Sequence, residues 1–199
     1  MPIFSFRREA IRCYVPGQMS AQGIHFEMRA EVFRAARLCA PGMAHLGPVT
    51  FQEDASNPLA MIRWRESVFQ AALAPVASRA LEAARLGVRE LVDIDRSCER
   101  LFPAPLREAS RRAGCRLASA RSAPMGETTL ARFLEKIAAG DCPGHLAVVF
   151  AARAAVFHFP VPVVLAGLVF VEMRGLRLDR LWTVIEEAVP SRTRRELVA

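Results

Sequence analysis

The sequence is poor in lysine and tyrosine. Lys136 is the only lysine and Tyr14 the only tyrosine among 199 residues, so almost all of the positive charge, net +7, is carried by arginine. Arginine pairs with carboxylates and phosphates through two parallel hydrogen bonds, so this balance suits protein interfaces and also permits nucleic-acid binding. The arginines are scattered, and no run of five or more basic residues occurs. The sequence therefore offers no basic cluster for a nucleic acid.

The motifs of common enzyme classes are also missing. There is no G-x-S-x-G elbow, no glycine-rich phosphate loop and no H-E-x-x-H pair. Asp93 and Asp95 lie two positions apart on a predicted helix, so their carboxylates face different directions and form no acid/base pair. These absences favour a protein that acts by binding and not as an enzyme.

Cysteine is present but in no pattern that indicates disulfides or a metal site. The five cysteines are odd in number and widely spaced, and the first fifteen residues do not resemble a secretory signal. Reduced thiols in a cytoplasm are expected. Cys142 and His145 form one C-x-x-H pair, but structural zinc needs four ligands and no second pair exists. We therefore expect a turn there and no metal.

The longest apolar stretch is divided by prolines. The run 146–157 contains Arg153, and Pro160 and Pro162 separate it from a second run, 163–171. A membrane-spanning helix needs ~20 consecutive apolar residues. Prolines this close together break a helix. The stretch predicts two buried helices joined by a tight turn near Phe159, and a membrane-associated protein built on 146–173 is the alternative.

Helical periodicity dominates the rest of the chain. Asn57 followed by Pro58 is typical of a helix start, and Gly87 and Gly140 are typical of helix ends. No strand pattern is convincing. Helices are predicted over 3–14, 27–39, 58–87 with a bend or break at Pro75, 88–101, 105–120, 129–139, 146–157, 163–171 and 178–189. The fold class expected is all-α, a single compact domain over 1–199 of about eight or nine helices around a buried central hairpin, with 190–199 as a flexible tail.

Three segments together resemble the urease accessory protein UreF family. In "PLREASRRAGCRLASA" the matching residues are Leu106 to Ser110, Gly114, Arg116 and Leu117. In "GHLAVVFAARAAVFHFP" they are His145, Val148 to Phe150 and Pro160. In "VPGQMSAQGIHFE", which is similar to a glycine-rich family hallmark, they are Pro16, Gly17, Ser20, Gln22, Gly23 and Glu27. The resemblance is closest over 88–185, and Met19, Ala21 and Ala151 depart from the family pattern.

This resemblance implies an all-α cytoplasmic accessory protein without enzymatic activity or a cofactor of its own. Proteins of this kind dimerise, bind UreD (also called UreH), recruit the GTPase UreG and help to deliver nickel to apo-urease, without a nucleic acid or a membrane. The partner-binding residues that it implies are Gln22, Gly23, Arg107, Glu108, Ser110 and His145.

Plainer interpretations of the same residues stay open. Arg107, Glu108 and Ser110 are also expected on any solvated helix face, and Gln22 and Gly23 in any loop turn. A helix-start hydrogen bond is the preferred interpretation of His145, and whether Cys142 and His145 contact nickel is open. The alternative function is an arginine-rich helical nucleic-acid binder, whose affinity would fall steeply with salt.

Overall fold

The computed structural model describes residues 21–41, 49–51, 57–120, 128–173 and 176–189, with side chains from residue 28 onward. Helices are the only regular elements in these ranges, which confirms the all-α prediction. They are α1 (Ala21–Cys39), α2 (Pro58–Arg63), the π-helix η2 (Trp64–Leu73), α3 (Ala74–Leu86), α4 (Val88–Leu101), α5 (Ala104–Ala118), α6 (Thr129–Ala138), α7 (Leu146–Val156), α8 (Val161–Glu172) and α9 (Leu178–Ala188). The predicted segment 3–14 and the predicted tail 190–199 lie outside the described residues.

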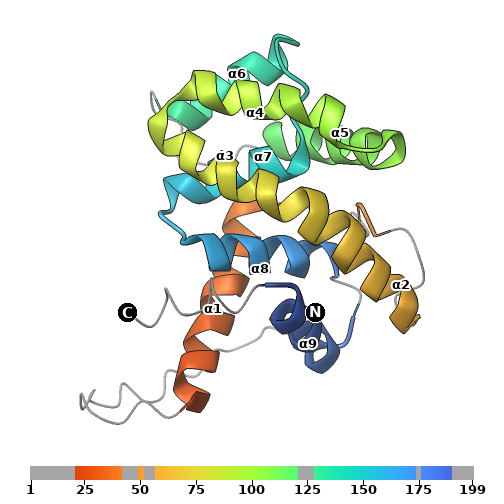
Figure 1. Ribbon diagram of the computed structural model, residues 1–199. Helices are drawn as coiled ribbons and strands as arrows, with labels where there is room; N and C mark the ends of the chain where they lie inside the picture. The colour runs from red at the N-terminus through yellow and green to blue at the C-terminus, as the bar shows by residue number, and fades with distance from the viewer. Residues whose placement is uncertain (1–20, 42–48, 52–56, 121–127, 174–175, 190–199) are drawn as a thin grey trace, which may run out of the picture.

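The hairpin of α7 and α8 forms the centre of the molecule, as predicted (Figure 1). Helix α7 packs against α3 on one side and α5 on another, and α8 packs against α1 and α9. The chain turns between the two helices at Phe157 to Pro160, and Pro160 precedes α8 as its N-cap. Among the described residues, no helix is long and apolar enough to cross a membrane.

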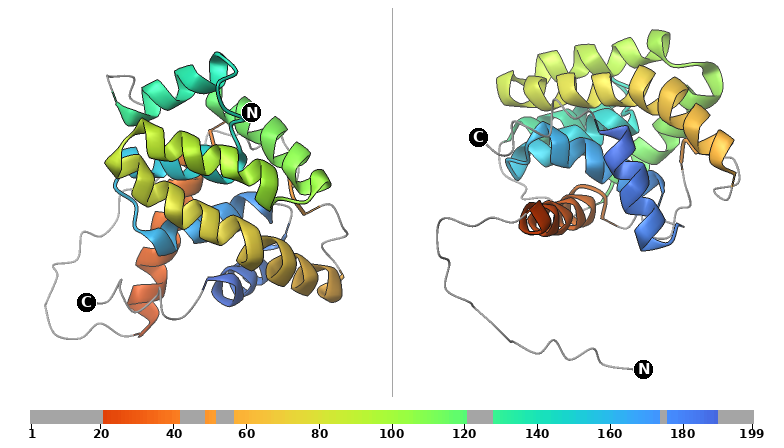
Figure 2. Two further views of the ribbon diagram at one scale, coloured as in Figure 1. Left: turned by 45° about the horizontal axis from the view of Figure 1, so that its top comes forward. Right: turned by 60° about the horizontal axis from the view of Figure 1, so that its bottom comes forward.

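The other helices lie in layers on the two sides of this hairpin. Helices α4, α5 and α6 lie beyond α3 and α7, while α1 and α9 lie on the side of α8 (Figures 1 and 2). Helix α4 follows α3 after Gly87 and packs against it. The connection between α6 and α7 is therefore enclosed by α4 and α5, which positions the site described below.

Arg153 is the one charged residue of α7, and it is fully buried. Its guanidinium donates to the carbonyl oxygen of Leu38 (3.5 Å), in the last turn of α1, and to that of Ala120 (3.2 Å), just beyond α5. The last carbonyls of a helix have no partner within the helix and carry its negative dipole end. A buried cation is therefore tolerated here because a carbonyl in the last turn of α1 and a backbone carbonyl just beyond α5 accept its hydrogen bonds.

Helices α2, η2 and α3 form one continuous helical run from Pro58 to Leu86. Asn57 caps its start as predicted, because its side chain accepts the N–H groups of Leu59 and Ala60. The predicted bend or break at Pro75 is a change of helix type instead. The N–H of Ala74 donates to the carbonyl of Phe69, five residues back, and this wider π-helical turn ends directly before Pro75, which has no N–H and crowds the carbonyl of an α-helical turn.

Glu172, at the end of α8, ties a distant segment to the hairpin. Its Oε2 accepts backbone N–H groups of Val49 (2.9 Å), Thr50 (2.8 Å) and Phe51 (3.4 Å). The carboxyl is buried, and burial raises its pKa although the three N–H donors oppose that shift. Residues 49–51 lie outside every predicted helix, and the bonds to Glu172 hold their backbone against the core.

Candidate functional site

The site lies where the connection between α6 and α7 meets α4 and α5. Helix α6 ends in a Schellman motif, in which Gly140 (φ 78°) donates to the carbonyl of Ile137 and Asp141 donates to that of Lys136. Glycine adopts this left-handed conformation without the steric cost of a Cβ atom. Gly140 therefore stops the helix as predicted and directs the chain toward α4, where Arg96 donates to the carbonyl of Asp141 at 2.8 Å.

Asp95 caps helix α7 from a different helix. It lies on the apolar face of α4, is fully buried, and accepts the N–H of Gly144 at 2.6 Å and that of His145 at 2.7 Å. The first N–H groups of a helix have no partner within it, so α7 needs acceptors from outside. Burial raises the pKa of Asp95 to about 6, and the hydrogen bonds from His145 and Gly144 partly oppose that shift.

Helix α5 completes the contact with the start of α7. Ser110 is fully buried, and its Oγ accepts the N–H of Leu146 at 3.1 Å. A Cβ atom on Gly114 would lie 1.9 Å from the carbonyl oxygen of Gly144, so only glycine allows the two backbones to approach this closely. The Cys115 thiol, on the same helix, donates to the carbonyl of Pro143 at 3.4 Å. Three successive N–H groups, those of residues 144–146, are thus satisfied by side chains of α4 and α5.

His145 connects this buried contact to the surface. Its ring is fully buried and lies edge-on to Phe102, with the ring centroids 5.3 Å apart. Its Nε2 is 3.1 Å from Oε1 of Glu99, and its Nδ1 has no partner among the described residues. Burial lowers the pKa of His145, and the neighbouring Glu99 carboxylate partly opposes that shift. A neutral ring with its proton on Nε2 therefore donates to Glu99.

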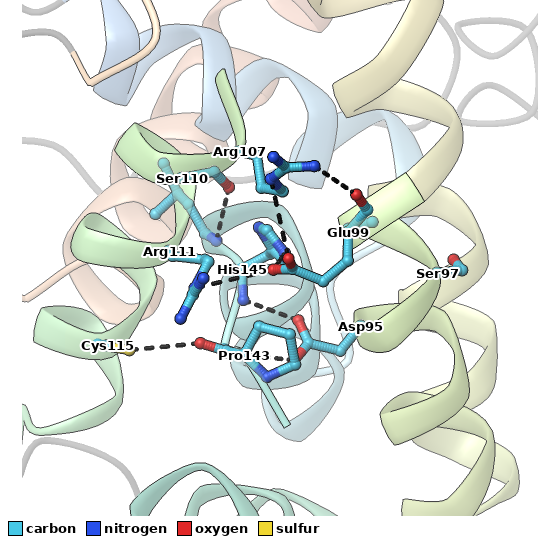
Figure 3. A network of polar contacts seen from close by, with 12 residues as sticks. Asp95, Ser97, Glu99, Arg107, Ser110, Arg111, Cys115, Pro143 and His145 are labelled. Atoms are coloured by element: carbon cyan, nitrogen blue, oxygen red, sulfur yellow. Dashed lines mark hydrogen bonds and ion pairs between the residues drawn. The ribbon is translucent and has the colours of Figure 1, made fainter. Parts of the chain in front are cut away.

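Glu99 in turn orients two arginines of α5 (Figure 3). Arg107 donates from Nη1 to the Glu99 carbonyl at 2.8 Å, and its Nε lies 3.8 Å from Oε2. The Nε of Arg111 lies 3.7 Å from Oε1. We call Asp95, Glu99, Arg107, Ser110, Arg111 and His145 the α4–α5 network. It runs from fully buried groups to half-exposed guanidinium groups.

The outer face of α5 carries a surface hollow next to this network. We call it the α5 hollow; its volume is about 590 Å³, and it is lined by Ala104, Arg107, Glu108, Arg111, Arg112, Cys115 and Arg116. Four arginines and one glutamate give it a formal charge of +3. The four arginines lie within ten consecutive residues, and about two and a half turns of α5 place them around this hollow.

The sequence of this chain was compared with models of known protein families. The UreF family model matches residues 54–177, which contain the whole α4–α5 network and the central hairpin. The chain belongs to the UreF family. No curated protein and no solved structure gives a significant match. The UreF match begins earlier than the closest part of the resemblance, 88–185, and it includes neither the N-terminal hallmark nor α9.

The structure brings together three of the residues that the UreF resemblance singled out. Arg107, Ser110 and His145 all belong to the α4–α5 network, and Glu108 is exposed on the adjoining hollow. Ser110 does not lie on a solvated helix face as that interpretation supposed, because it is fully buried. It supports the start of α7 and presents no surface for direct contact with a partner.

Gln22 and Gly23 lie apart from this group. The interpretation as a loop turn is wrong, since both lie in the first turn of α1, which begins at Ala21, six residues before the predicted start. Their side chains lie outside the described part of the structure. Helix α1 lies across α8, on the side of the hairpin away from α5 (Figure 1).

The helix-start interpretation of His145 holds for its backbone but not for its side chain. The backbone N–H makes the expected kind of bond at the start of α7, to Asp95. The side chain makes no capping bond and pairs with Glu99 instead. Glu99 was not predicted, because nothing in "SCERL" distinguishes it from a solvated glutamate. Asp95 did carry a signal, being the one polar residue on the apolar stripe of α4.

The described residues contain no group of three or more histidine, cysteine, aspartate and glutamate side chains arranged to hold a metal ion. Cys142 is buried beside Asp95, and burial raises the pKa of its thiol to about 12. The site can hold a backbone turn rigidly and present arginines, which is the chemistry of a binding surface.

Proposed function

We propose that this protein is a non-enzymatic scaffold in urease maturation, which binds UreD (UreH) and recruits the GTPase UreG for insertion of nickel into apo-urease. Membership of the UreF family is the observation that carries the proposal. Nickel is the cargo of the assembled complex in this scheme, and this chain supplies contacts and no resident cofactor. We further propose that it works in the cytoplasm as a homodimer.

The geometry of the α4–α5 network supports a scaffold role. A binding surface gains affinity when its side chains are already held in the bound arrangement, because less conformational entropy is lost on association. Glu99 holds Arg107 and Arg111, and the buried ring of His145 holds Glu99. Arginine is enriched among residues that dominate binding energy at interfaces. These features favour recognition of a protein.

Co-expression with UreD and UreG from the same genome tests the proposal. An affinity tag on this chain should retain both partners in stable stoichiometry through size-exclusion chromatography with light scattering. A tagged, unrelated helical protein of similar charge is the control for non-specific retention. If the folded chain, checked by circular dichroism, elutes alone while UreD and UreG are present and soluble, the proposal is wrong.

A further inference from the structure

We infer that the α5 hollow is a docking surface for an acidic segment of a partner protein, whose carboxylates pair with Arg107, Arg111, Arg112 and Arg116. The inference rests on the proposed function in one respect, namely that the partner is a protein. It goes further in assigning the contact to one helix face and in stating the chemistry of the segment that binds there.

The arginines of the hollow fall into two pairs with different surroundings. Arg107 and Arg111 are held by Glu99. Arg112 and Arg116 are exposed, and neither makes a hydrogen bond or ion pair with any residue that the structure describes. Two guanidinium groups are thus positioned in advance, and two have all their donors available. Guanidinium groups bind carboxylates in a bidentate manner, which suits the hollow to an acidic ligand.

The charge and extent of the hollow favour a protein over a nucleic acid. Nine positions separate Arg107 from Arg116, so the arginines extend over about 14 Å of the helix. Glu108 lies within the hollow, and Glu99 lies beside its arginines Arg107 and Arg111. A nucleic acid gains affinity from each phosphate that is neutralised, so carboxylates at this position would weaken it. An acidic protein segment can place its carboxylates on the arginines and an uncharged residue opposite Glu108, whereas a nucleic acid carries a phosphate at every nucleotide.

Fluorescence anisotropy with two labelled probes of equal charge tests the inference. The probes are decaglutamate and an oligonucleotide of eleven thymidines, titrated with the full chain at low salt. The test variant carries Arg112→Glu and Arg116→Glu, which remove no contact within the described part of the fold. The matched control carries Arg85→Glu and Arg89→Glu. These arginines are also exposed; Arg85 lies in the last turn of α3 and Arg89 in the first turn of α4, at the end of α4 farthest along the chain from α5.

The inference predicts saturable binding of decaglutamate, weaker binding of the oligonucleotide, and loss of peptide affinity of about tenfold or more in the test variant. The control variant should stay within about twofold of the unmodified chain, because its charge change is equal but distant. Equal affinity of the two variants, no saturable binding of decaglutamate, or tighter binding of the oligonucleotide would each overturn the inference. Circular dichroism spectra confirm that both variants are folded.

The two proposals fail separately. A chain that binds decaglutamate as expected but does not retain UreD or UreG contradicts the proposed function and leaves the docking surface in place. The opposite result is that the chain forms the complex, but its Arg112→Glu, Arg116→Glu variant binds decaglutamate as tightly as the control variant. That result contradicts the docking surface alone.

Discussion

The carboxylate of Asp95 accepts the backbone N–H of His145 at 2.7 Å, across fifty positions of sequence. Together with its bond to Gly144, this contact fixes the first turn of α7, the helix at the centre of the fold. The side chain of His145 then reaches Glu99, which holds two arginines at the surface. The same short segment therefore stabilises the core and orients the proposed binding surface.

Asp95→Ala should destabilise the fold strongly. The substitution leaves the N–H groups of Gly144 and His145 buried without acceptors, which costs roughly 1–3 kcal/mol for each group. Asp93→Ala is the matched control, since Asp93 is exposed on the same helix and its loss should change stability by no more than ~0.5 kcal/mol. Urea denaturation gives both free energies of unfolding, and equal values would contradict the capping role.

The contribution of Asp95 to stability should depend on pH. Burial raises the pKa of Asp95 from 3.8 to about 6 in the folded protein, so the folded chain holds a proton there that the unfolded chain has lost. Stability from this group is fully present below pH 3.8 and is lost as the pH rises to about 6. The full shift corresponds to about 3 kcal/mol.

The unfolding free energy of the unmodified chain minus that of Asp95→Ala isolates this contribution. Two other buried groups also make stability depend on pH. Burial raises the pKa of Glu172, so its effect has the same sign as that of Asp95. Burial lowers the pKa of His145, so its effect has the opposite sign. Glu172 is common to both chains and cancels. The difference should be larger at pH 4 than at pH 7, and a difference that grows with pH would show that the folded state favours the charged carboxylate.

Gly114→Ala should destabilise the protein although it improves helix propensity. In an exposed helix, alanine is favoured over glycine by up to ~1 kcal/mol. Here the new Cβ atom would lie 1.9 Å from the carbonyl oxygen of Gly144, so α5 and the start of α7 must separate. We expect a net loss of roughly 1–3 kcal/mol, the usual cost of overpacking. An increase in the thermal midpoint would show that the two backbones are not in close contact.

The cysteines should differ sharply in reactivity. Cys115 is exposed, whereas Cys39, Cys98 and Cys142 are buried and burial raises the pKa of each of these thiols to about 12. A thiolate is the reactive species. In a Cys13→Ser background, a native chain treated with a chromogenic disulfide reagent should show one fast thiol. Adding Cys115→Ser should remove that phase, and its persistence would place another thiol at the surface.

Arg153→Met should cost roughly 1–3 kcal/mol, because the carbonyls of Leu38 and Ala120 would lose a buried donor. Methionine keeps much of the volume, so little of the loss would come from a cavity. Arg132→Met, on the exposed face of α6, is the control. Equal denaturation midpoints for the two variants would mean that the helix ends do not depend on Arg153.

Local sequence patterns predicted most of the helices, because helix ends depend on neighbouring residues. Val88–Leu101 agrees with its predicted bounds, Gly140 ends α6, and Pro160 separates the two central helices. The start of α1 was missed, since "SAQG" precedes any apolar periodicity. At Pro75, where a bend or break was predicted, the helix type changes: the N–H of Ala74 donates to the carbonyl of Phe69 in a π-helical turn, and α3 continues beyond the proline.

The site was only partly predictable, because its contacts join residues far apart in sequence. In the sequence, Asp95 lies on an apolar stripe and Gly114 lies inside a helix, where glycine costs stability relative to alanine. Neither feature identifies the residues that Asp95 and Gly114 contact, because Gly144 and His145 lie in a connection whose path depends on the whole fold. The arginines of the α5 hollow lie within ten consecutive residues, so the sequence places them on one helix, but the hollow that they line appears only in the folded chain.

Nickel content of urease tests the central claim most directly. The urease subunits of the same genome should be purified from cells that express the other accessory proteins with and without this chain, and nickel per active site measured by mass spectrometry. The account predicts at least about a tenfold loss of nickel without the chain, at unchanged subunit abundance, with restoration by the unmodified chain. Urease fully loaded with nickel in the absence of this chain would contradict it.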